Sequence, residues 1–130
     1  MRKFGAFFIL IILLIMVSGC NNTSSNISKI TLEQKNLTVK VLDKNTHKKL
    51  ESVFDKVKWE PKTQVSMSRK EDCRLEVTYK VHSKSEMVGY LIWFSKIGTA
   101  ELVSSDQNES YGELDKVNTK TLKEITEMNK

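Results

Sequence analysis

Residues that commonly hold metal ions are scarce in this sequence. It contains two cysteines, Cys20 and Cys73, and two histidines, His47 and His82, which lie far apart. There is no CxxC or HExxH spacing, and the five glycines are scattered rather than grouped into a phosphate-binding loop. The sequence therefore predicts neither a metal site nor a cofactor, and we expect both histidines to be solvated surface residues.

A nucleophile beside an activating base is equally hard to find. Cys73 and His82 are nine residues apart, and on one strand this spacing would separate them by up to about 30 Å. A pairing of Cys73 with His47 is left open, although nothing in the sequence supports it. Cys73 falls in an alternating apolar segment, which favours a buried, unreactive thiol. We expect the protein not to be an enzyme.

Two pairs of carboxylates have ordinary structural explanations. Glu71 and Asp72 stand before a predicted strand, in a turn where an aspartate commonly accepts a backbone hydrogen bond. Glu124 and Glu127 fall on the solvated face of a predicted helix. Neither pair predicts an acid–base site.

Positive charge is in excess but is not concentrated. The formal net charge is +5, and removal of residues 1–19, with Arg2 and Lys3, would lower it to +3. Acidic residues are interspersed among the lysines, so the sequence has no basic stripe of the kind that binds nucleic acid. A weakly basic domain would be attracted mildly to an anionic membrane or wall polymer.

The first twenty residues have the layout of a secretory signal peptide that ends at a cysteine. Arg2 and Lys3 precede an apolar run from Phe4 to Val17, and Ser18, Gly19 and Cys20 follow it. The order of hydrophobic, hydroxyl, glycine and cysteine residues resembles a bacterial lipobox. This resemblance implies cleavage before Cys20 and a diacylglycerol thioether on its sulfur. Two or three acyl chains would hold a small domain stably on a membrane.

Two alternatives to the lipid anchor were considered. A transmembrane helix needs about 20 apolar residues, and this run is shorter. A cleaved secretory signal without lipid is also compatible with a small residue at Gly19. With the lipid anchor, the chain divides into a signal peptide (1–19), a lipidated N-terminus with a polar tether (20–28), and one small domain (29–130). The expected location is the extracytoplasmic side of the cell membrane.

The domain alternates between strand-like and helix-like patterns. Alternating apolar residues predict strands near residues 30–32, 37–41, 65–67, 73–81, 87–94, 100–103 and 111–114. Apolar residues on both faces of 87–94 predict a central strand that is covered by helix on at least one face. We expect the last strand, 111–114, to lie at an edge.

Two amphipathic helices complete the domain. Leu50, Val53, Phe54 and Val57 form one apolar stripe, with Thr46 as the expected N-cap and an end before Pro61. A second helix after Asn118 or Thr119 buries Leu122, Ile125 and Met128. The pattern predicts an α+β fold: an antiparallel meander sheet of about five strands with two helices packed on one face.

The order of apolar and aromatic positions resembles a known family. It is carried by a helix ending in Val57-Lys58-Trp59, a strand through residues 75–79, the segment Tyr90-Leu91-Ile92-Trp93-Phe94, and Tyr111 before a closing amphipathic helix. These features are similar to the small YhfM-like lipoproteins of Gram-positive bacilli. The resemblance covers about residues 27–128 and implies a lipid-anchored extracytoplasmic domain with no established activity.

The sequence favours a non-enzymatic interaction or accessory module at the cell surface. Its partners would be the membrane, through Cys20, and a protein or wall polymer. The alternative is a lipoprotein that binds a small ligand or peptide in a crevice between helix and sheet. Trp59 and Trp93 are the candidate partner contacts, because tryptophan is common at interface hot spots, although core positions are also expected of them. A hydrolase with an unrecognised site is the third hypothesis.

Overall fold

The computed structural model describes residues 27–34 and 39–127, apart from the side chain of Lys40. Cys20, the signal peptide and most of the predicted tether lie outside the described residues. Within the described part of the chain, neither helix is long and apolar enough to cross a membrane. The described chain is already in a strand at Ile27, which is buried and pairs with Tyr79. The ordered domain therefore includes two residues that the sequence assigned to the tether.

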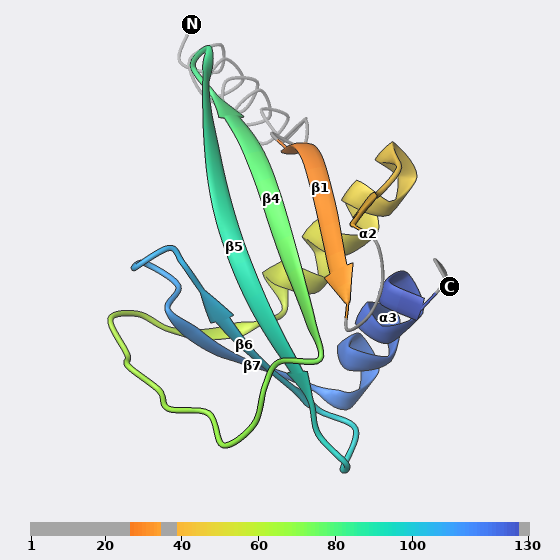
Figure 1. Ribbon diagram of the computed structural model, residues 1–130, viewed down its shortest axis with the longest axis vertical. Coiled ribbons are helices and arrows are strands. Elements are labelled where there is room, and N and C mark those ends of the chain that lie inside the picture. The colour runs from red at the N-terminus through yellow and green to blue at the C-terminus, as the bar shows by residue number, and fades with distance from the viewer. Residues whose placement is uncertain (1–26, 35–38, 128–130) are drawn as a thin grey trace, which may run out of the picture.

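One antiparallel sheet of seven strands forms the centre of the domain (Figure 1), in the order β2-β1-β4-β5-β6-β7-β3. The strands are β1 (Ile27–Gln34), β2 (Lys40–Val41), β3 (Lys58–Glu60), β4 (Cys73–Val81), β5 (Lys84–Phe94), β6 (Ala100–Ser104) and β7 (Tyr111–Leu114). The predicted meander is confirmed, since β4 to β7 are neighbours in chain order. The predicted central strand is confirmed as β5.

The sequence underestimated the sheet by about two strands. No strand forms at residues 65–67; instead the chain forms β3 earlier, directly after the first helix. β3 pairs with β7, with Trp59 opposite Gly112, and so β7 is not the edge strand that the sequence predicted. Three-residue β3 has too short a pattern to be recognised before its partner is known.

Both helices are capped at their N-termini by an aspartate that directly precedes them, rather than by the predicted residues. In α2 (Lys44–Asp55), the Asp43 carboxylate accepts a 2.9 Å hydrogen bond from the Thr46 amide. In α3 (Lys116–Glu127), Asp115 accepts a 2.8 Å bond from the Asn118 amide. An N-cap aspartate supplies an acceptor to amides that have no partner within the helix. α2 also ends earlier than predicted, because the chain turns into β3.

The core lies between the helices and one face of the sheet. Alternate residues of β4 and β5 point into it, including Leu75, Val77, Tyr90 and Ile92. From the helices come Leu50 and Val53 of α2 and Leu122 and Ile125 of α3. Both helices lie on this side of the sheet, as the sequence predicted (Figure 1).

The face of the central strand β5 that points away from the helices is covered in part by a loop. Residues 61–72, which connect β3 to β4 in the chain, run past this face (Figure 1). The indole N–H of Trp93 donates a 2.8 Å hydrogen bond to the Arg69 carbonyl, and only 6% of Trp93 is exposed. The second apolar face of β5 is thus buried in part by irregular chain.

His47 corrects another prediction. The sequence placed it on the surface, but it is 6% exposed, and its Nε2 lies 3.2 Å from the Leu42 carbonyl oxygen. His47 lies within α2, three residues before Leu50. This spacing places both side chains on the same, inward face of the helix. His82 is exposed, as predicted, in the turn between β4 and β5, where His82 and Ser83 both have positive φ.

Candidate binding crevice

A pocket of about 400 Å³ lies where the C-terminal part of α2 meets the sheet. We call it the crevice; it is lined by Ile27, Glu51, Phe54, Asp55, Val57, Trp59, Tyr79 and Glu109. These residues come from β1, α2, the connection between α2 and β3, β3, β4 and the loop between β6 and β7. The volume is within the usual range for small-molecule sites, about 300–1,000 Å³.

One wall of the crevice is aromatic. The rings of Phe54 and Tyr90 stack with centroids 4.5 Å apart and an interplanar angle of 29°. The Trp59 ring is 6.0 Å from the Tyr90 ring, centroid to centroid, and is tilted by 40° to it. Trp59 remains half-buried, so its ring both packs against the core and faces the crevice.

Hydroxyl and carboxylate groups form a continuous hydrogen-bond chain beside that wall. The Tyr79 and Tyr90 hydroxyl oxygens are 3.2 Å apart, and the Tyr90 hydroxyl donates to Glu109 Oε1 at 2.9 Å. The Ser104 hydroxyl donates to the same Glu109 oxygen at 2.8 Å. Two donors therefore fix the position of the Glu109 carboxylate.

Burial keeps both tyrosines of this chain neutral. Burial raises the pKa of Tyr90 far above its usual value, and its bonds to Tyr79 and Glu109 raise it further. Burial also raises the pKa of Tyr79, and the negative charges of Glu109 and Glu51 add to this increase, whereas its hydrogen bond with Tyr90 opposes it. These phenols can orient a ligand by hydrogen bonding, but their pKa values are displaced away from the range useful for proton transfer.

Glu51 and Asp55 form the acidic side of the crevice. They are four residues apart on α2, a spacing that places both on the same face of a helix. Glu51 is half-buried and Asp55 is exposed. Their spacing can be read from the sequence, but only the fold shows that Glu109 lies beside the same crevice.

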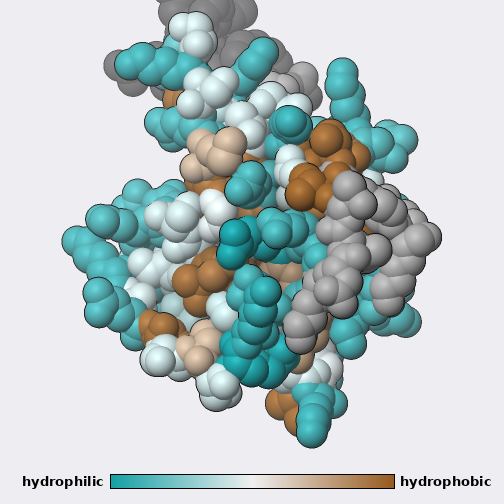
Figure 2. Space-filling view, viewed as in Figure 1, coloured by the Kyte–Doolittle hydropathy of each residue, from teal (hydrophilic) through white to brown (hydrophobic). Residues whose placement is uncertain are grey.

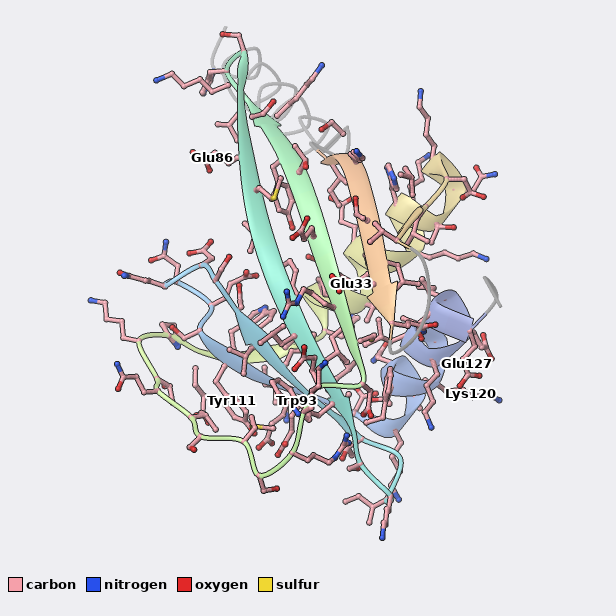
Figure 3. All side chains as sticks on the ribbon, viewed as in Figure 1. Glu33, Glu86, Trp93, Tyr111, Lys120 and Glu127 are labelled. Carbon is pink, nitrogen blue, oxygen red and sulfur yellow. The ribbon has the colours of Figure 1, made fainter. Side chains whose placement is uncertain are left out.

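A second pocket, of about 360 Å³, lies on the other face of the sheet next to Trp93. Arg69 and Lys96 line it together with Glu101. Arg69 is held by a bidentate ion pair with Asp72 at 2.7 and 2.8 Å, and it donates to the Phe94 carbonyl. In Figure 3, the labelled Trp93 and Tyr111 are seen on the side of the sheet where the 61–72 loop crosses.

The two predicted contact residues thus have different surroundings. Trp59 lines the crevice and is partly open to it, whereas Trp93 is nearly fully buried and bonded to the loop. In the view of Figure 2, the surface is mostly hydrophilic, and hydrophobic side chains gather only in small, separate groups. The predicted lipid-attachment residue, Cys20, lies outside the described residues.

The remaining sequence candidates are dispersed. Cys73 is a buried free thiol at the start of β4, and His82 follows the other end of that nine-residue strand. The predicted burial of Cys73 is confirmed, and burial raises the pKa of its thiol to about 12. Asp72 accepts the Phe94 amide at 2.7 Å, and Glu124 and Glu127 are exposed. Among the described residues, no group of three or more His, Cys, Asp or Glu side chains is arranged to hold a metal ion.

The crevice is formed by residues from separate parts of the chain. Of these, Trp59 alone was a predicted contact residue. The stacking residues Phe54 and Tyr90 were predicted as core, and Glu109 was assigned to a loop. One signal was present in the sequence: Glu51 and Asp55 repeat at helical spacing towards the end of α2, where acidic residues are disfavoured. The position of Glu109 depends on the tertiary structure alone.

Comparison with known proteins gives little further information. No family model matches the chain, and none of the curated proteins matches it. Among solved structures, the chain is similar to a thioesterase-like protein from Clostridium sporogenes, with a TM-score of 0.49 and 18% identity over 78% of this chain and 94% of that chain. The resemblance to YhfM-like lipoproteins therefore stays a prediction.

Proposed function

We propose that this protein is a non-enzymatic, lipid-anchored binding protein of the cell surface that holds its ligand in the crevice between α2 and the sheet. The observation that carries this proposal is the crevice itself, an open pocket of about 400 Å³ with a partly exposed tryptophan and hydrogen-bonding groups around it. A concave site that combines apolar surface with a few fixed polar groups is the usual form of a ligand site. The occupant is a small molecule or a short peptide segment.

Binding fits the chemistry of the crevice better than catalysis does. Its described lining residues supply carboxylates, a tyrosine and apolar groups, and none of them is a cysteine, serine, threonine, lysine or histidine. The tyrosine pKa values are raised, so these groups stay protonated at neutral pH. The hydrogen-bond chain from Tyr79 to Ser104 acts to fix the shape of the crevice, which reduces the entropy lost when a ligand binds.

The anchor places this site at the outer face of the membrane. Cys20 follows an apolar signal segment and precedes small polar residues, and lipid on this cysteine holds the domain close to the headgroups. Replacement Cys20→Ala should release the domain from the membrane or leave an unprocessed precursor. Mass spectrometry of the native amino terminus checks this, and an N-terminus without lipid would contradict it.

Tryptophan fluorescence can test the crevice directly. The chain has two tryptophans, so the Trp93→Phe variant reports on Trp59 alone. We expect small-molecule and peptide probes to change this emission in a saturable manner with the full-length lipoprotein in nonionic detergent. A panel that covers cationic, neutral and anionic probes and gives no saturable change, with the variant shown to be folded by circular dichroism, would refute the proposed function.

A further inference from the structure

We infer that the crevice selects an organic ammonium cation, such as a free alkylamine or the side chain of a lysine in a peptide. This inference rests on the proposed binding function and adds the chemical class of the ligand. It is based on three carboxylates, from Glu51, Asp55 and Glu109, that line one pocket together with Trp59. Among the residues that the structure describes, no lysine or arginine lines the crevice beside them.

The three carboxylates have no cationic partner within the described residues. The ion pairs in residues 27–34 and 39–127 are Arg69 with Asp72 and Arg74 with Glu71, both away from the crevice. Lys56 follows Asp55 directly but forms no ion pair with it there. Negative charge that is gathered in a pocket of reduced polarity attracts positive ligands more strongly than the same charge on an open surface.

The end of α2 adds to the negative charge on this side of the crevice. Glu51 and Asp55 are like charges at i, i+4 spacing, which disfavours a helix by a few tenths of a kcal/mol, about as much as an opposite pair would favour it. They also lie towards the C-terminal end of the helix, where the backbone dipole is negative and no basic residue occupies the last turn. A bound ammonium group would relieve both repulsions.

Glu109 presents a specific acceptor to such a ligand. Its Oε1 already accepts hydrogen bonds from Tyr90 and Ser104. Its Oε2 has no hydrogen-bond donor within the described residues, and the side chain lines the crevice. The carboxylate is therefore held in place by one oxygen while the other is available for an N–H donor.

The aromatic wall suits the same chemistry. The half-buried indole of Trp59 offers a π-face, and tryptophan is the best aromatic partner for an ammonium cation. Ile27, Phe54 and Val57 provide apolar surface for an alkyl chain. The second pocket makes a contrast, because Arg69 and Lys96 line it and would repel a cation.

Matched probes separate charge selection from binding in general. Cadaverine represents a small amine, and a short peptide with one lysine represents the peptide source. Pentanediol, glutarate and the same peptide with norleucine are the neutral and anionic controls. With full-length Trp93→Phe lipoprotein in nonionic detergent, we expect one or both cations to change Trp59 emission saturably, and high salt to weaken this binding. The source is assigned to whichever cation binds more tightly.

Isosteric variants then test the residues. Glu109→Gln should weaken cation binding about tenfold, because the amide keeps an acceptor but loses the charge. Glu51→Gln and Asp55→Asn should each weaken it about threefold. Glu124→Gln is the matched control, since Glu124 is exposed on α3 and its replacement should leave binding unchanged. Thermal unfolding of each variant confirms that it is folded.

Two results would overturn the inference, and they differ from the failure of the proposed function. Saturable binding of pentanediol or glutarate that equals or exceeds cadaverine would show that the crevice binds ligands without selecting cations. Cation binding that the three crevice substitutions leave unchanged would place the cation elsewhere. If no probe of any charge class binds, the proposed function fails together with the inference.

Discussion

Trp59 lies directly opposite Gly112 in the antiparallel pairing of β3 with β7. A Cβ atom at position 112 would stand 2.7 Å from Trp59 Cε3 and closer still to the side chain of Val57. Glycine is therefore required here by close approach, not by backbone conformation. This contact sets the position of the indole on one side of the crevice.

Gly112→Ala should disturb both the fold and the site. Overpacking at a buried position typically costs about 1–3 kcal/mol of unfolding free energy, and the displaced indole would weaken ligand binding in the crevice. Gly89→Ala is the control, since a Cβ there meets its nearest neighbour, Ser105 Oγ, at 3.9 Å. Urea unfolding measures the difference. Equal stability of the two variants would show that Trp59 adapts freely to the added methyl group.

The Cys73 thiol should resist modification in the folded protein. Its pKa is raised to about 12 by burial, with smaller effects from the charges of Asp72 and Glu71, whereas an ordinary cysteine has a pKa of about 8.5. At about pH 9 an exposed cysteine would be mostly thiolate and would react rapidly with iodoacetamide. Peptide mapping by mass spectrometry should find Cys73 unlabelled until denaturant is added. Rapid labelling under native conditions would disprove its burial.

Tyrosine ionisation should be coupled to unfolding at high pH. All three tyrosines, Tyr79, Tyr90 and Tyr111, have raised pKa values, chiefly because of burial. For Tyr111, the hydroxyl oxygen lies 3.1 Å from a carboxylate oxygen of both Glu101 and Glu113, and donation of its single proton to either one favours the protonated phenol as well.

The direction of the pH effect follows from these shifts. The contribution of each tyrosine to stability is complete below the unfolded pKa of about 10 and is lost as pH rises towards the folded value. Absorbance of the phenolate should therefore lag behind that of free tyrosine and increase together with the loss of circular dichroism. A normal tyrosine titration with the fold intact would contradict the burial of these side chains.

Asp72 should contribute more to stability than its neighbour Glu71. Its Oδ2 accepts the Phe94 amide at 2.7 Å, at the end of the central strand. In Asp72→Ala this amide would lose its acceptor, which should lower the free energy of unfolding by about 1–2 kcal/mol. Glu71→Ala breaks only a 3.3 Å ion pair with Arg74 and should cost about 0.5 kcal/mol. Chemical denaturation compares the two, and a larger effect from Glu71 would reverse this assignment.

Much of the sheet could be predicted because period-two alternation survives wherever one face is buried. Leu75, Val77 and Tyr79 on β4 are examples, and the two-sided apolar pattern of β5 correctly placed it in the centre. His47 could not be predicted in the same way. It lies three residues before Leu50 whichever residue caps the helix, but a polar side chain in the first turns of a helix is equally compatible with a solvated position when read locally.

The crevice was only partly predictable for a related reason. A helix–sheet crevice followed from the expected layers, and Trp59 was singled out from residue type alone. The carboxylate of Glu109 reaches this site through hydrogen bonds with Tyr90 and Ser104, which are 19 and 5 residues away in sequence. Local patterns contain no information about such contacts, because they are formed between segments that pack together only in the fold.

The sequence alone determined the α+β class, the meander order, the central strand and the burial of Cys73, since these follow from the periodicity of apolar residues within single segments. The tertiary structure decided that β3 would extend the sheet, that the 61–72 loop would bury Trp93, and that three carboxylates would line one pocket with Trp59. Those outcomes depend on pairing and packing between segments that are distant in the sequence. The free energy of such a contact depends on both segments, so neither segment alone predicts it.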